Sequence, residues 1–171
     1  PKSRLFSKHP EWVLSYPNRE ILMGRNQYEL DMANPEVVDY LIQVLDELLS
    51  ENAIDYIKWD MNRHLCEKYS AALPPERQGE VAHRYVLGIY ALLERLTARY
   101  PGLLIESCSG GGGRFDAGML YYTPQIWCSD NTDAIERLRI HYGTSFGYPM
   151  SSVSAHVSVC PNHQNGRVTP F

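Results

Sequence analysis

The sequence lacks the features that would direct it to a membrane or to a nucleic acid. No apolar run approaches the roughly 20 residues that a membrane-spanning helix needs, and the first residues lack the apolar core of a signal peptide. The 16 lysines and arginines stand against 20 acidic residues, and neither sign gathers into a run that could follow a phosphate backbone. We therefore expect a soluble, cytoplasmic protein with no membrane and no nucleic acid among its partners.

Motifs for zinc and for activated nucleophiles are also missing. The four cysteines form no Cys-x-x-Cys pair, so reduced thiols are expected, and the six histidines show no ligand spacing, so a zinc site is not expected. No Gly-x-Ser-x-Gly elbow is present. Cys108 as a nucleophile would need a histidine from elsewhere in the fold, so a small ligand-facing thiol is the favoured interpretation.

What the sequence does contain is an alternation of strand-like and helix-like segments. Apolar residues at helical spacing, bounded by caps, prolines and glycines, predict helices, and short apolar runs between them predict strands. The expected strands are 21–28, 54–60, 103–108, 125–130 and 153–159. One expected helix starts at Asn34–Pro35, and three others cover 80–100, 116–122 and 134–146.

This order predicts an α/β fold with parallel strands, either a doubly wound sheet or a (β/α) barrel. A chain of 171 residues can bury one core, which makes it one domain or part of one. Arg25, Asp60, Cys108 and Asp130 each stand where an apolar strand gives way to a loop. A barrel gathers such residues around one pocket, whereas an open sheet spreads them along an edge, so the barrel is favoured.

The glycine run 109–114 fits neither of the common nucleotide-binding motifs. It matches Gly-x-Gly-x-x-Gly only through its abundance of glycine, and no Gly-Lys-Ser/Thr follows it. Glycine does let a backbone approach a ligand closely and offers free N–H groups at a helix start. A flexible turn is the alternative interpretation.

The segment Ile54–Arg63 is interpreted as a buried strand that ends in charged and polar groups. Lys58 and Asp60 share one face of an extended chain, so the ammonium is expected to lie beside the carboxylate and to favour its ionised form. An ionised carboxylate suits a nucleophile or a charge stabiliser. An ordinary surface ion pair is the alternative.

Asp130 supplies a second carboxylate at another strand end. Asp133 falls where an acidic residue caps a helix, and we assign it that role, although Asp130 could itself be a cap. Two carboxylates from different strands, one ionised and one able to carry a proton, are the equipment of a glycoside hydrolase. Trp127 and Tyr28 could stack on a sugar face or belong to the core. Arg25, Lys58 and Asn62 could bind sugar hydroxyls.

Three long blocks of the sequence carry a family resemblance. They are Lys58–Arg63, Glu106–Asp116 and Cys128–Leu138, and practically the whole chain fits from His9–Leu14 onward. In content and order the blocks resemble the signatures of glycoside hydrolase family thirty-six, chiefly bacterial α-galactosidases. The resemblance implies retaining hydrolysis of α-1,6-galactosides such as melibiose and raffinose, without a metal or any other cofactor.

By this resemblance Asp60 is the nucleophile at the fourth barrel strand and Asp130 is the acid/base at the sixth. Further residues match family positions that bind the galactosyl unit, namely Arg25, Lys58, Asn62, Cys108, Gly110, Gly111 and Trp127. Two alternative functions stay open. One is an α-galactosyl transferase of the same family, and the other is a non-catalytic galactoside-binding module, which would not need two carboxylates.

The resemblance also implies that residues 1–171 are a single segment of a (β/α)8 catalytic barrel, about strands 3 to 7 with their intervening helices. The family's N-terminal β-sandwich, first strands, last strand and C-terminal β domain would be absent. Because about five strands cannot close a barrel, the isolated chain is expected to be nearly inactive. The parent enzyme is expected to be a homo-oligomer.

Overall fold

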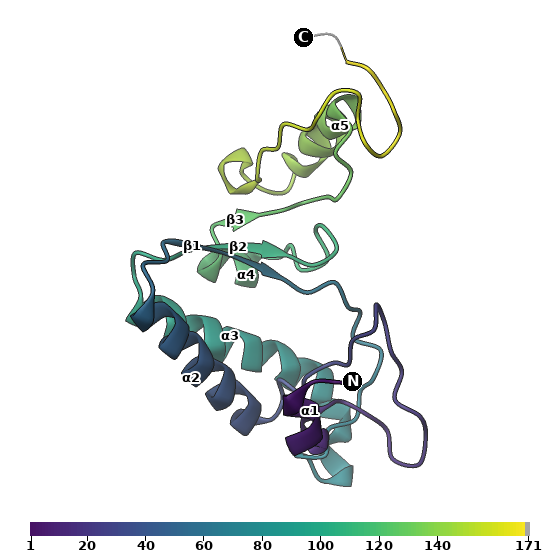
Figure 1. Cartoon of the computed structure of the whole chain (residues 1–171), viewed down its shortest axis with the longest axis vertical. Helices are drawn as coiled ribbons and strands as arrows, with labels where there is room; N and C mark the ends of the chain where they lie inside the picture. The colour runs from purple at the N-terminus through teal and green to yellow at the C-terminus, as the bar shows by residue number, and fades with distance from the viewer. Residues whose placement is uncertain (170–171) are drawn as a thin grey trace. The chain divides into compact units, whose positions relative to one another are not determined.

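The computed structural model describes residues 1–169, which divide into two compact units (Figure 1). The first unit comprises residues 1–55 and 63–103, and the second comprises residues 56–62 and the chain from Leu104 onward. No helix among the described residues is long and apolar enough to cross a membrane.

Two long helices form the core of the first unit. Helix α2, Pro35–Glu51, begins where the side chain of Asn34 accepts a hydrogen bond from the N–H of Glu36 (3.0 Å), with proline in the first position. Helix α3, Val81–Arg99, packs against α2. The apolar stripe that helical spacing predicts for α3 is buried at every position: Val81, Tyr85, Ile89, Leu92, Leu93 and Leu96.

The remaining elements of the first unit are short, and the strand expected at 21–28 is wrong. The unit also contains α1 (Arg4–Lys8) and two 3₁₀ turns, η1 (Pro10–Trp12) and η2 (Pro75–Glu80). Gly24 and Gln27 hydrogen-bond to each other through their backbones, so the chain turns at Arg25 and Asn26, whose φ values are 52° and 59°.

A side chain, rather than a neighbouring strand, satisfies the backbone of this turn. The guanidinium group of Arg63 donates to the carbonyl oxygens of Leu22 (2.7 Å) and Gln27 (3.4 Å). The apolar residues that suggested a strand, Leu22 and Met23, are about half exposed. An apolar run without a partner strand therefore folds into a turn that carries Arg25.

The second unit is built on three parallel strands in the order β1-β2-β3 (Figure 1). They are β1 (Tyr56–Asp60), β2 (Leu104–Cys108) and β3 (Gln125–Ile126). The expected strands 54–60 and 103–108 are confirmed, but the expectation that the first is buried is wrong, because no residue of β1 is buried. The third strand ends after two residues instead of reaching Asp130. The register pairs Lys58 with Glu106 and Asp60 with Cys108.

Helices α4 (Ala117–Tyr122) and α5 (Ala134–Thr144) follow the strands of this unit. The side chain of Asp116 caps α4. Asp133 caps α5 by accepting from the N–H groups of Ile135 (3.0 Å) and Glu136 (2.9 Å), which confirms its predicted role.

The strand expected at 153–159 is also wrong. After the 3₁₀ turn η3 (Met150–Ser152), Val153 forms one parallel bridge with Ile126, and the chain then leaves the sheet. Val157 is 96% exposed, so the apolar residues of this segment do not face a core. The α/β class is confirmed with three parallel strands, and not all five expected strands form within residues 1–169.

Candidate active site

The second unit brings candidate residues to the carboxyl ends of its parallel strands. Asp60 ends β1, Cys108 lies opposite it at the end of β2, and Asp130 follows β3 by four residues. On β1 the face that bears Lys58 and Asp60 is the exposed one, as the alternation of an extended chain requires.

Asn62 links Asp60 to the glycine loop, which we define as Ser109–Gly113. Its Nδ2 donates to the carboxylate of Asp60 (2.5 Å), and its Oδ1 accepts from the N–H of Gly110 (3.0 Å). The hydroxyl of Ser109 donates to the carbonyl oxygen of Met61 (2.8 Å), which adds a second bond between the loop and the end of β1. The loop and the carboxylate of Asp60 are thus fixed to each other.

The glycine loop also packs directly on the backbone near Asp130. A Cβ on Gly111 would lie 3.0 Å from the Cα of Ser129 and 3.2 Å from the backbone nitrogen of Asp130, and its φ is +86°. A Cβ on Gly112 would lie 2.9 Å from the carbonyl oxygen of Cys128. Glycine is needed here because the two backbones touch, so the loop joins the ends of two strands and is more than a flexible turn.

The expected ion pair between Lys58 and Asp60 is not formed in the described chain. The ammonium of Lys58 lies 3.3 Å from the carboxylate of Glu106, its register partner on β2. Neighbouring strands are about 4.8 Å apart, whereas residues two apart on one strand are separated by roughly 6.6 Å, so the residue across the sheet is the nearer partner.

Glu106 is a functional candidate that sequence reasoning missed. It is buried, and besides Lys58 it binds the hydroxyl of Tyr56 and accepts from Nε2 of Gln125 (3.3 Å). Burial first, and then the hydrogen bond to Glu106, raises the pKa of Tyr56 to about 12. Only the strand register, which pairs Glu106 with Lys58, shows that Glu106 belongs to this cluster. In the sequence, Glu106 stands alone among apolar and small residues.

Cys108 is buried, and burial raises the pKa of its thiol, with its hydrogen bond to Asp60 acting in the same direction. A raised pKa disfavours the thiolate that a cysteine nucleophile requires, so the site holds Cys108 as a neutral neighbour of Asp60. None of the four cysteines forms a disulfide bond within residues 1–169.

Trp127 contacts Asp130 directly. Its Nε1 donates to the carboxylate of Asp130 (2.8 Å). Two cations lie over the indole ring, Lys58 at 4.6 Å and Arg137 at 4.5 Å from the centroid. Arg137 is buried and donates to backbone carbonyls on either side of Asp130, a supporting role that the sequence gave no reason to expect.

An open pocket of about 570 Å³ adjoins these residues within the second unit. Its lining includes Lys58, Trp127, Asp130, His163 and Gln164. Among residues 1–169, no group of three or more His, Cys, Asp or Glu side chains is arranged to hold a metal ion.

The predicted site residues are therefore only partly assembled by the described contacts. Arg25 and Tyr28 belong to the first unit, where Tyr28 packs against Phe6 with ring centroids 4.9 Å apart. The others lie in the second unit and are connected by the contacts above: Lys58, Asp60, Asn62, Cys108, Gly110, Gly111, Trp127 and Asp130.

Comparison with known proteins gives a consistent result. The family model described as melibiase matches residues 1–171. Alpha-galactosidase 1 of Pediococcus pentosaceus is 62% identical over 167 residues, covering 98% of this chain and 23% of the relative. Alpha-galactosidase AgaA of Geobacillus stearothermophilus is 58% identical over 168 residues, again covering 98% of this chain and 23% of the relative.

Solved structures agree. The crystal structure of the family 36 α-galactosidase AgaA from Geobacillus stearothermophilus superposes with a TM-score of 0.96 and 58% identity, covering 99% of this chain and 24% of that one. The chain thus spans about a quarter of the length of these relatives. Because the family model matches the whole sequence, the chain belongs to the melibiase family, that of the glycoside hydrolase family 36 α-galactosidases.

Proposed function

We propose that the chain is a segment of the catalytic barrel of a retaining α-galactosidase, which releases terminal α-1,6-linked galactose from melibiose- and raffinose-type oligosaccharides. The observation that carries the proposal is the glycine loop, which binds Asn62, the partner of Asp60, and packs on the backbone of Asp130. One short loop therefore borders two carboxylates, one at the end of β1 and one in the turn after β3, and a glycosidase needs two such groups.

The relatives support the same assignment. Two variants of AgaA from Geobacillus stearothermophilus, which share an alanine-to-glutamate substitution, were solved with bound sugars. One also has an aspartate replaced by asparagine and binds raffinose, and the other has an aspartate replaced by alanine and binds stachyose. The two replaced aspartates are separated in that enzyme by as many residues as separate Asp60 from Asp130. A substrate that survives in the crystal is the expected result of removing a catalytic carboxylate.

In the proposed mechanism, Asp60 attacks the anomeric carbon while Asp130 donates its proton to the departing oxygen. Asp130 then takes a proton from water, whose oxygen displaces Asp60 and releases galactose. Two inversions give net retention. The galactosyl unit is bound by the residues that match the family's galactosyl-binding positions. They are Arg25, Lys58, Asn62, Cys108, Gly110, Gly111 and Trp127.

Azide rescue tests the assignment of the nucleophile in the full-length enzyme. Asp60→Gly should abolish turnover of a nitrophenyl α-galactoside, and azide should restore part of it by entering the space left by the carboxylate. The expected product is β-galactosyl azide, because azide attacks from the face opposite the leaving group. The α-anomer, or full activity without azide, would refute the role of Asp60. Product analysis with melibiose would separate hydrolysis from galactosyl transfer.

The isolated chain is proposed to be nearly inactive. Within the described residues β1 pairs on one side only, so its other edge is unpaired, and a barrel avoids such edges by closing. We also propose that the parent enzyme is a homo-oligomer. Size-exclusion chromatography and a nitrophenyl α-galactoside assay of this chain alone test the first point, and a compact monomer with full turnover would contradict it.

A further inference from the structure

The turn that carries Asp130 lies outside the strand ladder. Strand β3 ends at Ile126 and α5 begins at Ala134, and we call residues 129–133 between them the Asp130 turn. The last backbone bond from this region to β2 runs from the N–H of Trp127 to the carbonyl oxygen of Ser107 (2.9 Å). A displacement of about 1 Å in a catalytic group can cost about a hundredfold in rate, so other contacts must fix this turn.

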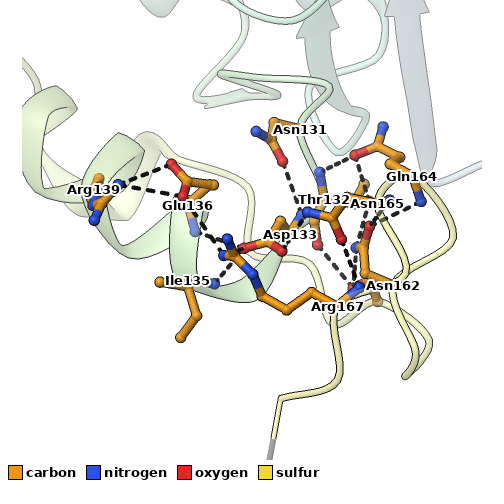
Figure 2. A network of polar contacts seen from close by, with 11 residues as sticks. Asn131, Thr132, Asp133, Ile135, Glu136, Arg139, Asn162, Gln164, Asn165 and Arg167 are labelled. Atoms are coloured by element: carbon orange, nitrogen blue, oxygen red, sulfur yellow. Dashed lines mark hydrogen bonds and ion pairs between the residues drawn. The ribbon is translucent and has the colours of Figure 1, made fainter.

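One side-chain amide bridges the Asp130 turn. Oε1 of Gln164 accepts from the backbone N–H (2.8 Å) and from the hydroxyl (3.0 Å) of Thr132, as Figure 2 shows. Nε2 of Gln164 donates to the backbone carbonyl oxygen of Asp130 (2.9 Å). The reverse orientation of the amide would place N–H against N–H and oxygen against oxygen, so the chemistry of the partners determines the orientation.

Gln164 is itself held in place by a buried asparagine. Oδ1 of Asn162 accepts from the N–H groups of Gln164 (2.9 Å) and Asn165 (3.3 Å). Its Nδ2 donates to the hydroxyl of Thr132 (3.2 Å), which is also a partner of Gln164. The side chain of Asn162 is thus shared between the Asp130 turn and the segment that approaches it (Figure 2).

A second anchor lies at the far end of the Asp130 turn. The buried carboxylate of Asp133 accepts from Nδ2 of Asn165 (2.8 Å) and pairs with Arg167 (2.6 Å), while it also caps α5 (Figure 2). The hydrogen bond from Asn165, followed by those from the α5 backbone and the charge of Arg167, lowers the pKa of Asp133. Asp133 therefore stays ionised and keeps this anchor charged at neutral pH.

All these partners come from residues 162–167, which we call the clamp. We propose that the clamp fixes the position of Asp130, and that Gln164 is the positioning residue through which it acts. The inference rests on the proposed function, since it assigns the clamp to the acid/base of that reaction. None of the clamp's hydrogen bonds within residues 1–169 reaches Asp60 or Asn62, so loss of the clamp should impair proton donation and spare nucleophilic attack.

The test compares two substrates of the full-length enzyme. The leaving group of melibiose is a sugar alkoxide that needs a proton, whereas the leaving group of a nitrophenyl α-galactoside is a stable phenolate. Gln164→Ala should lower kcat/KM for melibiose by about tenfold to a hundredfold, and for the nitrophenyl substrate by about threefold or less. This split is the signature of a misplaced acid, because kcat/KM reports the step in which the leaving group departs.

Gln78 provides a matched control. It too accepts from a backbone N–H, that of Ser70 (3.0 Å), and donates to two carbonyl oxygens, those of Ser70 (2.9 Å) and Leu73 (2.7 Å). Gln78→Ala should leave the ratio of the two kcat/KM values unchanged. Thermal unfolding of both variants identifies a general loss of folding.

If Gln164→Ala fails to fold, Gln164→Glu takes its place, because it keeps an acceptor for Thr132 and replaces the donor to Asp130 with a carboxylate oxygen that repels the carbonyl oxygen of Asp130. The same split between substrates is expected. Equal losses on both substrates, or no loss on either in a folded variant, would overturn the proposal. If the unsubstituted enzyme hydrolysed neither galactoside, the proposed function would fail instead.

Discussion

The two proposed catalytic aspartates are held in different ways. Asp60 ends a strand that pairs with β2 at five register positions, and the N–H of Met61 extends the pairing to the carbonyl oxygen of Cys108 (3.0 Å). Asp130 lies beyond a strand of two residues, and the side chains of Trp127, Arg137 and Gln164 hold it and its neighbours. Backbone pairing tolerates many sequences, whereas a side-chain bridge needs particular residues, so we expect Asp130, the proposed acid, to be the more easily displaced of the pair.

The largest contrast between the two aspartates should come from removing the acid itself. Asp130→Ala should lower kcat/KM for melibiose by about 10²–10⁴-fold, because general acid catalysis contributes on that scale. Nitrophenyl α-galactoside, whose leaving group needs little protonation, should lose far less. Steady-state kinetics on both substrates measure the difference, and equal losses would remove Asp130 from the acid role.

Removing the support of Asp60 should reduce activity on both substrates, whereas Gln164→Ala should reduce it mainly on melibiose. Asn62→Ala breaks the hydrogen bonds to Asp60 and to the N–H of Gly110. Both substrates require the nucleophile, so kcat/KM should fall by a similar factor for each, about tenfold to a hundredfold. Asn52→Ala, which removes only a bond to a carbonyl at the end of α2, is the control. A loss of activity on melibiose alone would show that Asn62 and Gln164 do not support different aspartates.

Substitution in the glycine loop should affect both aspartates together, with a smaller effect on stability. Gly111→Ala places a Cβ against the backbone of Ser129 at a φ of +86°. We expect the free energy of unfolding to fall by about 1–3 kcal/mol. Thermal unfolding and kinetics on both substrates measure the result. Gly79→Ala, where a Cβ would meet nothing within 4 Å, is the matched control. Unchanged stability in Gly111→Ala would contradict the close packing.

The smallest effect should come from the charge of the second anchor. The lowered pKa of Asp133 means that the folded state favours its ionised form, so this stability is fully present above the ordinary aspartate pKa of about 3.9. It is lost as the pH falls through the lowered native pKa. The difference in thermal unfolding midpoint between the unsubstituted enzyme and Asp133→Asn should therefore be constant near neutral pH and shrink in acid. A difference independent of pH would refute the ion pair.

Much of the regular structure was predictable because it depends on local patterns. The stripe of α3 has helical spacing over 19 residues, and the cap at Asn34 with the following proline marks the start of α2 without any knowledge of the fold. The strands β1 and β2 are short apolar runs that end in polar groups. The failures at 21–28 and 153–159 share one cause, since an apolar run becomes a strand only when a neighbouring strand pairs with it.

The candidate site was predictable where residues adjoin in sequence and less so where the fold unites them. The blocks around Asp60 and Asp130 are visible as motifs, and the capping role of Asp133 follows from its position alone. The partner of Lys58 depends on the register of two strands more than forty residues apart, so Glu106 was missed. Gln164 was missed for the same reason, because its link to Asp130 appears only when the chain folds back.

The most direct test of the central claim is the separation of the Asp60 and Asp130 carboxyl groups in a crystal structure of the full-length enzyme with a bound galactoside. A retaining pair that acts on one glycosidic bond requires about 5 Å, and this is the distance we predict. A separation of about 6.5–9.5 Å would indicate inversion, and a much larger one would show that the two aspartates do not share a site.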